Sequence, residues 1–167
     1  MSQAPSTADR VDVSSLGFTR RAWLAATPED AYRLISDVAL VGLWSPNASE
    51  VRYDEGAGPR AGAWFSGQNQ RGDRTWTTRS QVGEAVPGES FAFTVGGLAD
   101  GIVSWRWTIQ PSGSGCEIQQ SWSLRRYDPV LGATQADLDE LAAYMADSVE
   151  STLVALSRWC GERGERP

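Results

Sequence analysis

A long apolar stripe near the end of the chain constrains the fold more than any other feature of the sequence. From Thr134 to Cys160, apolar residues recur every three or four positions, which is the spacing of one helix face. The stripe consists of Leu138, Leu141, Met145, Val149, Leu153, Leu156 and Cys160. The pattern predicts one long amphipathic helix that closes the fold.

Strand patterns fill most of the chain before this helix. Apolar and polar residues alternate with a period of two in six consecutive segments, which are bounded by Gly, Pro, Asn or Asp. These segments are residues 49–54, 62–69, 73–86, 89–95, 102–110 and 115–126. They predict six strands in an antiparallel arrangement.

One further strand and two helical segments are predicted ahead of these six strands. Residues 18–26 have strand character, and a helix is expected to follow Thr27, which can cap it, with Pro28 in its first position. A second, short helical turn should end near Trp44, because Gly42 and Pro46 interrupt the pattern there.

The chain is predicted to hold one domain, because no internal linker divides residues 17–160. Residues 1–16 are interpreted as a disordered lead-in and residues 161–167 as a flexible tail, since both are polar.

Two turns predict which side chains share a face of the sheet, because paired residues on antiparallel strands point the same way. Pro87-Gly88 suits the centre of a type II turn, with Gly at the positive φ. A two-residue loop there pairs Glu84 with Phe91, Val82 with Phe93 and Ser80 with Val95. A weaker turn at Arg71-Gly72 pairs Asn69 with Arg74, Gly67 with Trp76 and Phe65 with Thr78.

The predicted inner face is rich in aromatic residues and also carries polar ones. Trp105 and Trp107 share one face of the strand at 102–110, and Gln120 and Trp122 share one face of the next strand. The chain has eight Trp, a heavy load for its length. We therefore expect the sheet to pack or bind something large and flat.

The residue inventory excludes several kinds of chemistry. All 15 basic residues are Arg, and Lys and His are absent, so a Schiff-base lysine, a His general base and a His metal site are excluded. Proton transfer has to come from Asp, Glu, Tyr, Cys or a bound water. The net charge of −6 argues against a nucleic-acid partner.

A cytoplasmic location is expected from the cysteines and from the apolar segments. Cys116 and Cys160 lie in no metal-ligand spacing and are predicted to be small core residues in a reducing compartment. No segment approaches the roughly 18 apolar residues of a membrane-spanning helix, and the first residues lack the apolar stretch of a signal peptide.

The order strand, two helices, six strands and a long helix is that of the α+β helix-grip fold, in which a curved antiparallel sheet wraps the last helix around a cavity. The stretch AATPEDAYRLISDV, followed by LWSPN, resembles the opening of the START-like (SRPBCC) superfamily, which includes polyketide cyclases and the birch pollen allergen. Further on, GAWFSGQNQRGDRTWTTRSQV, PGESFAFTV and SWRW are similar to an actinobacterial branch of polyketide cyclases or dehydrases. The resemblance covers residues 17–160.

This resemblance implies a hydrophobic ligand between the sheet and the last helix, with no obligatory metal or organic cofactor. Some members steer aldol condensation and dehydration of a poly-β-ketone chain, whereas others only carry lipids, quinones or hormones. A cyclase, aromatase or dehydratase of secondary metabolism is the leading hypothesis, and a non-catalytic carrier or sensor of an apolar molecule is the alternative. A protein-interaction domain is a third possibility, and the chain is expected to be a monomer or a homodimer.

Three residues are candidates for catalysis. Arg74 can stabilise a developing enolate, Tyr144 can act as a general acid, and Glu84 is a carboxylate on the same strand as Arg74. Each also has a structural interpretation. Arg74 can form a solvated pair with Asn69 at the rim, Tyr144 can be a packing residue, and Glu84 can be a solvated residue at the sheet edge. The candidates for ligand binding are Trp44, Phe65, Asn69, Trp76, Thr78, Ser80, Phe93, Trp105, Trp107, Gln120, Trp122, Met145 and Ser148.

Overall fold

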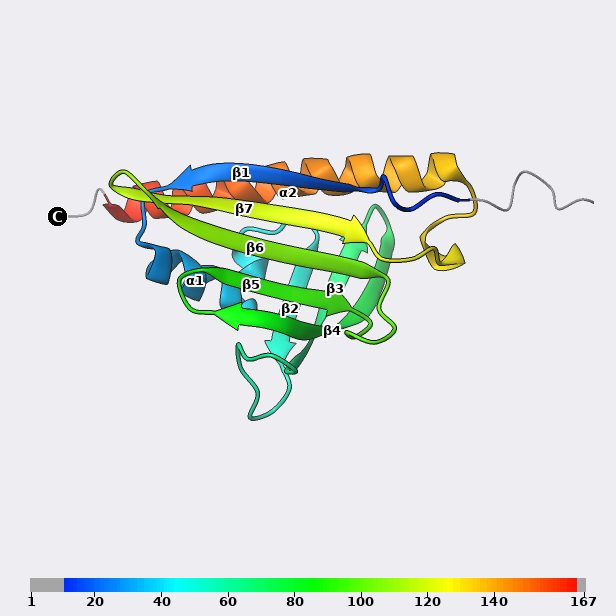
Figure 1. Cartoon of the computed structure of the whole chain (residues 1–167), viewed down its shortest axis with the longest axis horizontal. Coiled ribbons are helices and arrows are strands. Elements are labelled where there is room, and N and C mark those ends of the chain that lie inside the picture. Colours follow the sequence, from blue (N-terminus) through cyan, green and yellow to red (C-terminus); the bar gives the residue numbers. More distant parts are fainter. Residues whose placement is uncertain (1–10, 165–167) are drawn as a thin grey trace, which may run out of the picture.

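The computed structural model describes residues 11–164, and its helices and strands follow the predicted order (Figure 1). Seven antiparallel strands form one sheet in the order β1-β7-β6-β5-β4-β3-β2. The strands are β1 (Gly17–Leu24), β2 (Ala48–Tyr53), β3 (Trp64–Arg71), β4 (Arg74–Val86), β5 (Ser90–Val95), β6 (Val103–Ser112) and β7 (Gly115–Leu124). The helices are α1 (Pro28–Ser36), α2 (Gln135–Gly164) and two 3₁₀ helices, Val38–Leu43 and Pro129–Leu131.

The helix α1 begins where its capping residues predict. The Thr27 hydroxyl accepts a hydrogen bond from the Asp30 backbone N–H at 3.1 Å, and Pro28 follows in the first turn. Asp37 ends the helix, and its carboxylate accepts from the Ala39 N–H at 3.3 Å, which caps the following 3₁₀ helix. That short helix ends at Trp44, so both helical segments are confirmed.

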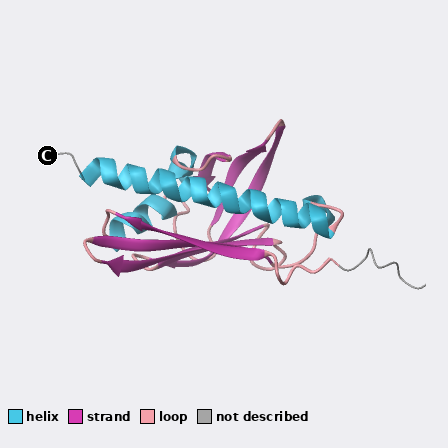
Figure 2. Ribbon diagram, turned by 90° about the horizontal axis from the view of Figure 1, so that it is seen from above, coloured by secondary structure: helices cyan, strands magenta, loops and turns pink. Residues whose placement is uncertain are grey.

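The long C-terminal helix is also confirmed, and it extends to Gly164, past the predicted end at Cys160. Its start is held by reciprocal capping: the Thr134 hydroxyl accepts from the Asp137 N–H at 3.1 Å, and the Asp137 carboxylate accepts from the Thr134 N–H at 3.0 Å. Seen from above, α2 lies along one face of the sheet, and the sheet curves up beside it (Figure 2). This face is called the concave face below. None of the helices within residues 11–164 is both long and apolar enough to cross a membrane.

Two apolar clusters fix α2 to the concave face. The first joins α1, β1, the sheet and the second half of α2, and it includes Leu24, Ile118 and Leu156, which are fully buried. The second joins the first half of α2 to β6 and β7 through Leu138 and Trp122. Burial at these clusters supplies the main stabilisation of the fold, at roughly 25 cal/mol per Å² of apolar surface removed from water.

The ends of the chain are only partly described. Leu16, which falls in the predicted lead-in, is buried in the second cluster, and the Asp12 backbone N–H donates to the Gln135 side chain at 3.0 Å. The packed part of the chain therefore begins before β1. The rest of the predicted lead-in, residues 1–10, and the last three residues of the predicted tail lie outside the described range.

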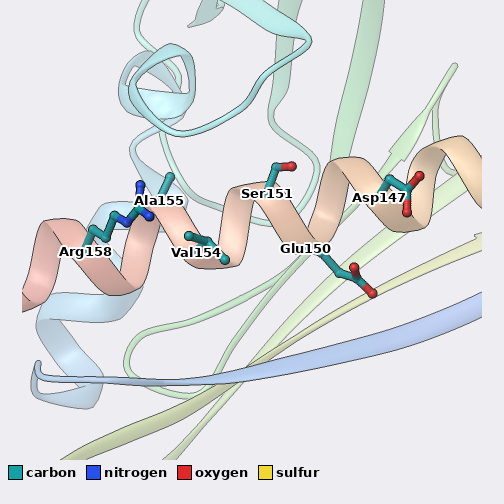
Figure 3. Close-up of a pocket in the computed structure, with 6 residues that line it drawn as sticks. All are labelled: Asp147, Glu150, Ser151, Val154, Ala155 and Arg158. Atoms are coloured by element: carbon teal, nitrogen blue, oxygen red, sulfur yellow. The ribbon is translucent and has the colours of Figure 1, made fainter.

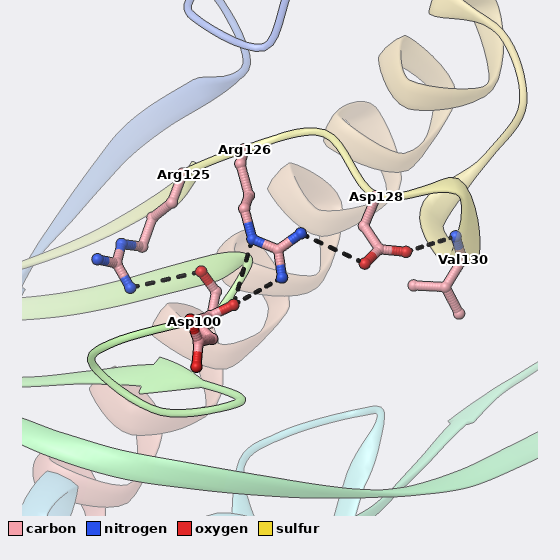
Figure 4. Close-up of polar contacts among 6 residues, drawn as sticks. Asp100, Arg125, Arg126, Asp128 and Val130 are labelled. Atoms are coloured by element: carbon pink, nitrogen blue, oxygen red, sulfur yellow. Dashed lines mark hydrogen bonds and ion pairs between the residues drawn. The ribbon is translucent and has the colours of Figure 1, made fainter.

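Two adjacent arginines after β7 hold the loop between β5 and β6 (Figure 4). Arg125 donates to the Gly101 carbonyl at 3.4 Å, and Arg126 donates to the Asp100 carbonyl at 2.7 Å. Arg126 also pairs with Asp128 at 3.5 Å, and Asp128 accepts from the Val130 N–H at 2.9 Å. These contacts tie the β5–β6 loop to the segment that leads into α2.

The register of the β3–β4 hairpin differs from the predicted one. The structure pairs Arg71 with Arg74 and Asn69 with Trp76, so the two-residue loop is Gly72-Asp73, and the predicted turn at Arg71-Gly72 is wrong. Gly72 takes a φ of 60°, which costs little for Gly and is unfavourable for Arg. The predicted pairs of Gly67 with Trp76 and of Phe65 with Thr78 are wrong for the same reason.

A β-bulge in β4 also overturns one predicted pair. Val82 pairs with Phe93 and Ser80 with Val95, as expected, but the register shifts between Val82 and Glu84. Glu84 therefore pairs with Ala92 and not with Phe91. An extra residue in one strand turns the following side chains to the other face, and Gly83, which has no side chain, sits at that position.

Candidate functional site

Aromatic side chains in the middle of the concave face are only half-buried. Phe93 and Trp105 pack against the apolar clusters, yet both retain solvent exposure. The Phe93 ring lies 5.0 Å from the Phe65 ring and 6.0 Å from the Phe91 ring, and Trp105 lies 6.5 Å from Trp122. Phe93 and Trp105, together with the half-buried Trp76 of β4, are called the aromatic wall below. Solvent reaches these three rings, which suits a flat apolar guest.

A chain of polar side chains joins α2 to the loop before β2. The Tyr144 hydroxyl donates to the Asn47 amide oxygen at 2.9 Å, and the Asn47 amide nitrogen donates to the Ser148 hydroxyl at 2.5 Å. The Asn47 backbone carbonyl accepts from the Gln70 N–H at 2.9 Å, so the same loop is fixed to β3. Tyr144, Asn47 and Ser148, all half-buried, are named the Tyr144 cluster below.

The β3–β4 hairpin supplies the neighbours of the Tyr144 cluster. The Arg71 guanidinium lies 4.4 Å from the centre of the Tyr144 ring, a cation–π distance. Asn69 donates to the Thr78 hydroxyl at 3.0 Å, and both side chains are half-buried on the concave side of the hairpin. The hairpin therefore brings polar groups to the edge of the aromatic wall.

Arg74 does not occupy the predicted position opposite Asn69. It is exposed, and its guanidinium lies 5.4 Å from the Trp76 ring centre, near the turn. Arg71, which the sequence interpretation assigned only to the turn, is the arginine that contacts Tyr144. Gly is favoured in the first position of a two-residue hairpin loop. This preference would have placed Gly72 there and left Arg71 in β3, which is the correct register.

Glu84 lies on the convex face, and the prediction that it shares a face with Phe93 is wrong. The Ser90 hydroxyl donates to Glu84, and Arg106 pairs with it at 2.6 Å. The Ser90 hydrogen bond, followed by the charge of Arg106, holds the pKa of the Glu84 carboxyl below its usual value. Glu84 lines a cleft of about 550 Å³ beside the start of α1, together with Pro28 and Glu29.

The predicted ligand-binding residues divide into two groups by burial. Those in the sheet lie on its concave face, and those in α2 lie on the side of the helix that faces the sheet. Trp44 lies in the first apolar cluster. Those that are buried in the core are Trp44, Phe65, Ser80, Trp107, Gln120 and Trp122. Those that remain half-buried, and so keep some contact with solvent, are Asn69, Trp76, Thr78, Phe93, Trp105, Met145 and Ser148.

A second depression of about 550 Å³ lies on the outward side of α2 (Figure 3). Its lining comes from this single helix and includes Asp147, Glu150 and Arg158, which are exposed and charged. One helix face cannot enclose an apolar molecule, because a ligand site needs walls on several sides. The aromatic wall under α2 is therefore the stronger candidate.

Other titratable groups near the core are suited to structural roles. Burial raises the pKa of the Cys116 and Cys160 thiols, so both stay protonated, in line with the predicted packing role. Burial also raises the pKa of Tyr53, whose hydroxyl donates to the Ser36 carbonyl at 2.7 Å. Within residues 11–164, Cys, Asp and Glu form no group of three or more placed to hold a metal ion.

Comparison with known proteins gives one family and many similar structures. Residues 16–159 match the family described as polyketide cyclase/dehydrase and lipid transport. A polyketide-cyclase-like protein of Corynebacterium glutamicum, solved by NMR in solution, is 30% identical, with a TM-score of 0.64 over 90% of this chain and 94% of that chain. No curated protein sequence matches the chain.

Two further structures share the fold at lower identity. A di-domain aromatase/cyclase of the steffimycin biosynthetic pathway is 18% identical, with a TM-score of 0.72 over 90% of this chain. The match covers 52% of that protein, so this chain spans about half of its length. A protein of Nitrosomonas europaea is 15% identical, with a TM-score of 0.69 over 92% of this chain and 99% of that chain.

Proposed function

Because the chain belongs to the polyketide cyclase/dehydrase and lipid transport family, we propose that it binds a flat, hydrophobic, polyketide-like molecule between the sheet and α2 and promotes its cyclisation, aromatisation or dehydration. The observation that carries this proposal is the half-buried aromatic wall: Phe93, Trp105 and Trp76 keep solvent exposure on the concave face, while their neighbours are buried. Aromatic walls bury a large area of a flat guest with few rotamers to restrict.

The proposed chemistry depends on positioning and on one proton donor. Of the three catalytic candidates, Tyr144 is the one held in a polar cluster. Its hydroxyl donates to Asn47, which in turn donates to Ser148, and Arg71 lies over its ring. A guest carbonyl that takes the place of the Asn47 oxygen would receive the Tyr144 hydrogen bond. Proton delivery to that oxygen is the acid half of an aldol cyclisation, and the wall aligns the reacting carbons.

The replacement Tyr144→Phe tests this chemistry. The assay follows absorbance as an aryl 1,5-diketone undergoes aldol cyclisation and dehydration to a conjugated enone, and tryptophan fluorescence quenching measures binding. We expect the variant to lose roughly 10²-fold or more in rate while it keeps its affinity, because a general acid contributes about 10²–10⁴-fold.

The matched control is Tyr127→Phe, since the Tyr127 hydroxyl donates to the Gly132 carbonyl and not to the Tyr144 cluster. This control should keep the wild-type rate. An equal rate for wild type and Tyr144→Phe would refute the role of Tyr144 as the acid.

A non-catalytic carrier is the second candidate, and two positions favour it. Arg74 is exposed at the hairpin turn, and Glu84 lies on the convex face, so neither is placed to assist Tyr144. Native mass spectrometry of freshly purified protein separates the candidates. A retained apolar guest, together with no acceleration of the diketone reaction, would favour the carrier. An absence of any guest, with no fluorescence quenching by aromatic polyketides or lipids, would refute both.

A further inference from the structure

Two buried hydrogen-bonding atoms on the concave face of β7 have no partner. Gln120 is 8% exposed and Trp122 is 1% exposed. Within residues 11–164, neither the Gln120 amide oxygen nor the Trp122 indole nitrogen makes a hydrogen bond. Buried polar atoms are almost always paired, because water no longer compensates for a missing partner, so this arrangement needs an explanation.

These two atoms differ from the other unpaired ones by their placement. Four buried side-chain atoms lack a partner in the described part of the chain, and only these two share one face of one strand. Residues two apart in a strand stand roughly 7 Å from each other on the same face. The two side chains are therefore neighbours on the concave face, within reach of one small group.

The surroundings of Trp122 include Trp105 of the aromatic wall. Phe18 stacks on Trp122 with ring centres 5.6 Å apart, and the half-buried Trp105 lies 6.5 Å from the same ring. Met145 of α2 packs against this cluster and is itself half-buried. An unbranched thioether side chain can change rotamer at little cost, so Met145 can make room for a guest that reaches Trp122.

We propose that Gln120 and Trp122 together recognise a hydroxyl group on the guest, an inference that rests on the proposed binding of a flat apolar molecule. The amide oxygen only accepts a hydrogen bond and the indole nitrogen only donates one. A hydroxyl does both, whereas a ketone or an ether can satisfy Trp122 but leaves Gln120 unpaired. The class of ligand indicated is thus a hydroxylated aromatic molecule, such as the phenol that forms when a cyclised poly-β-ketone becomes aromatic.

Calorimetric titration with three naphthalenes of similar shape tests this assignment. The probes are 2-naphthol, which donates and accepts, 2-methoxynaphthalene, which only accepts, and 2-methylnaphthalene, which does neither. Wild type should bind 2-naphthol about tenfold or more tightly than the other two, because only the hydroxyl pairs both buried atoms. In Gln120→Met, the preference for 2-naphthol over 2-methoxynaphthalene should disappear.

The thermal stability of the unliganded protein provides a second measurement. Gln120→Met replaces an unpaired buried amide by an apolar side chain of similar shape, so its Tm should equal or exceed that of wild type. A purely structural hydrogen bond through Gln120 predicts a lower Tm. Trp122→Phe keeps an aromatic ring and removes the donor, so it should lose the advantage of 2-methoxynaphthalene over 2-methylnaphthalene.

The matched control is Gln119→Met, because Gln119 is the residue before Gln120 in β7, points to the other face and donates to Glu117 at 3.2 Å. It should keep the wild-type preference. Equal binding of all three probes by wild type would overturn the hydroxyl site and leave the proposed function intact. Binding of none of them would overturn both. A lower Tm in Gln120→Met with an unchanged preference would assign Gln120 a structural role.

Discussion

Phe91 and Phe93 lie two residues apart on the same face of β5, yet they differ in burial. Phe91 is 1% exposed and packs edge-on against Tyr32 of α1, with ring centres 6.5 Å apart. Phe93 is half-buried, and its aromatic contacts, with Phe65 and Phe91, come from the sheet itself. Phenylalanine is therefore a core residue where α1 covers the sheet and a residue of the aromatic wall where α1 does not. Coverage by α1, and not residue type, separates the sealed Phe91 from the half-buried Phe93.

The largest effect expected from this comparison is on stability, in the sealed region. Phe91→Ala should lower the free energy of unfolding by about 3–5 kcal/mol, because it removes a buried ring and leaves a cavity. Phe93→Ala should cost clearly less, since part of its ring is already in contact with water. Urea denaturation of both variants measures the difference. Equal losses at the two positions would show that Phe93 is as much a core residue as Phe91.

The next largest effect is on guest binding, where Phe93 should matter more than Phe91. Phe93→Ala should weaken the binding of 2-naphthol about tenfold, because about 1–2 kcal/mol of aromatic contact with the guest is lost. Phe91→Ala, measured where it is fully folded, should bind 2-naphthol within about threefold of wild type. Calorimetric titration gives both affinities. A loss confined to Phe91→Ala would place the guest under α1 and refute the proposed wall.

The sequence predicted which residues share the concave face better than it predicted how residues pair across neighbouring strands. The β3–β4 register is displaced by two residues relative to the prediction, and a displacement of two leaves every side chain on its own face. Phe65, Trp76 and Thr78 therefore remain on the predicted face, although the pair of Asn69 with Arg74 does not form. The bulge near Gly83 displaces the pairing by one residue, and this is enough to move Glu84 to the other face.

The Tyr144 cluster shows what the local sequence pattern could not provide. Tyr144 and Ser148 lie one helical turn apart in α2, as their spacing of four residues predicts. Their common partner, Asn47, is 97 residues away from Tyr144 in the chain and lies in the loop before β2. No periodicity connects these positions, because the contact depends on how the curved sheet brings β2 and β3 up beside α2.

The smallest expected effect concerns Glu84, and it separates the convex from the concave face. Ser90 and Arg106 hold the pKa of Glu84 below its ordinary value of 4.5. A carboxyl whose pKa is lowered by folding stabilises the protein above its unfolded pKa, and this contribution is lost as the pH falls through the folded pKa. Glu84→Gln should therefore lower the free energy of unfolding by about 0.5–1 kcal/mol at pH 7, because the ion pair is partly exposed.

The stability difference between wild type and Glu84→Gln should shrink as the pH falls below 4.5, and urea denaturation across the acidic range measures it. Affinity for 2-naphthol should stay within about twofold of wild type at every pH where the protein is folded, since the bulge turns Glu84 away from the guest. Weaker binding with unchanged stability would instead place the carboxylate at the guest. That result would mean that the concave face carries a second acid-base group beside Tyr144, and the cyclase would then be favoured over the carrier.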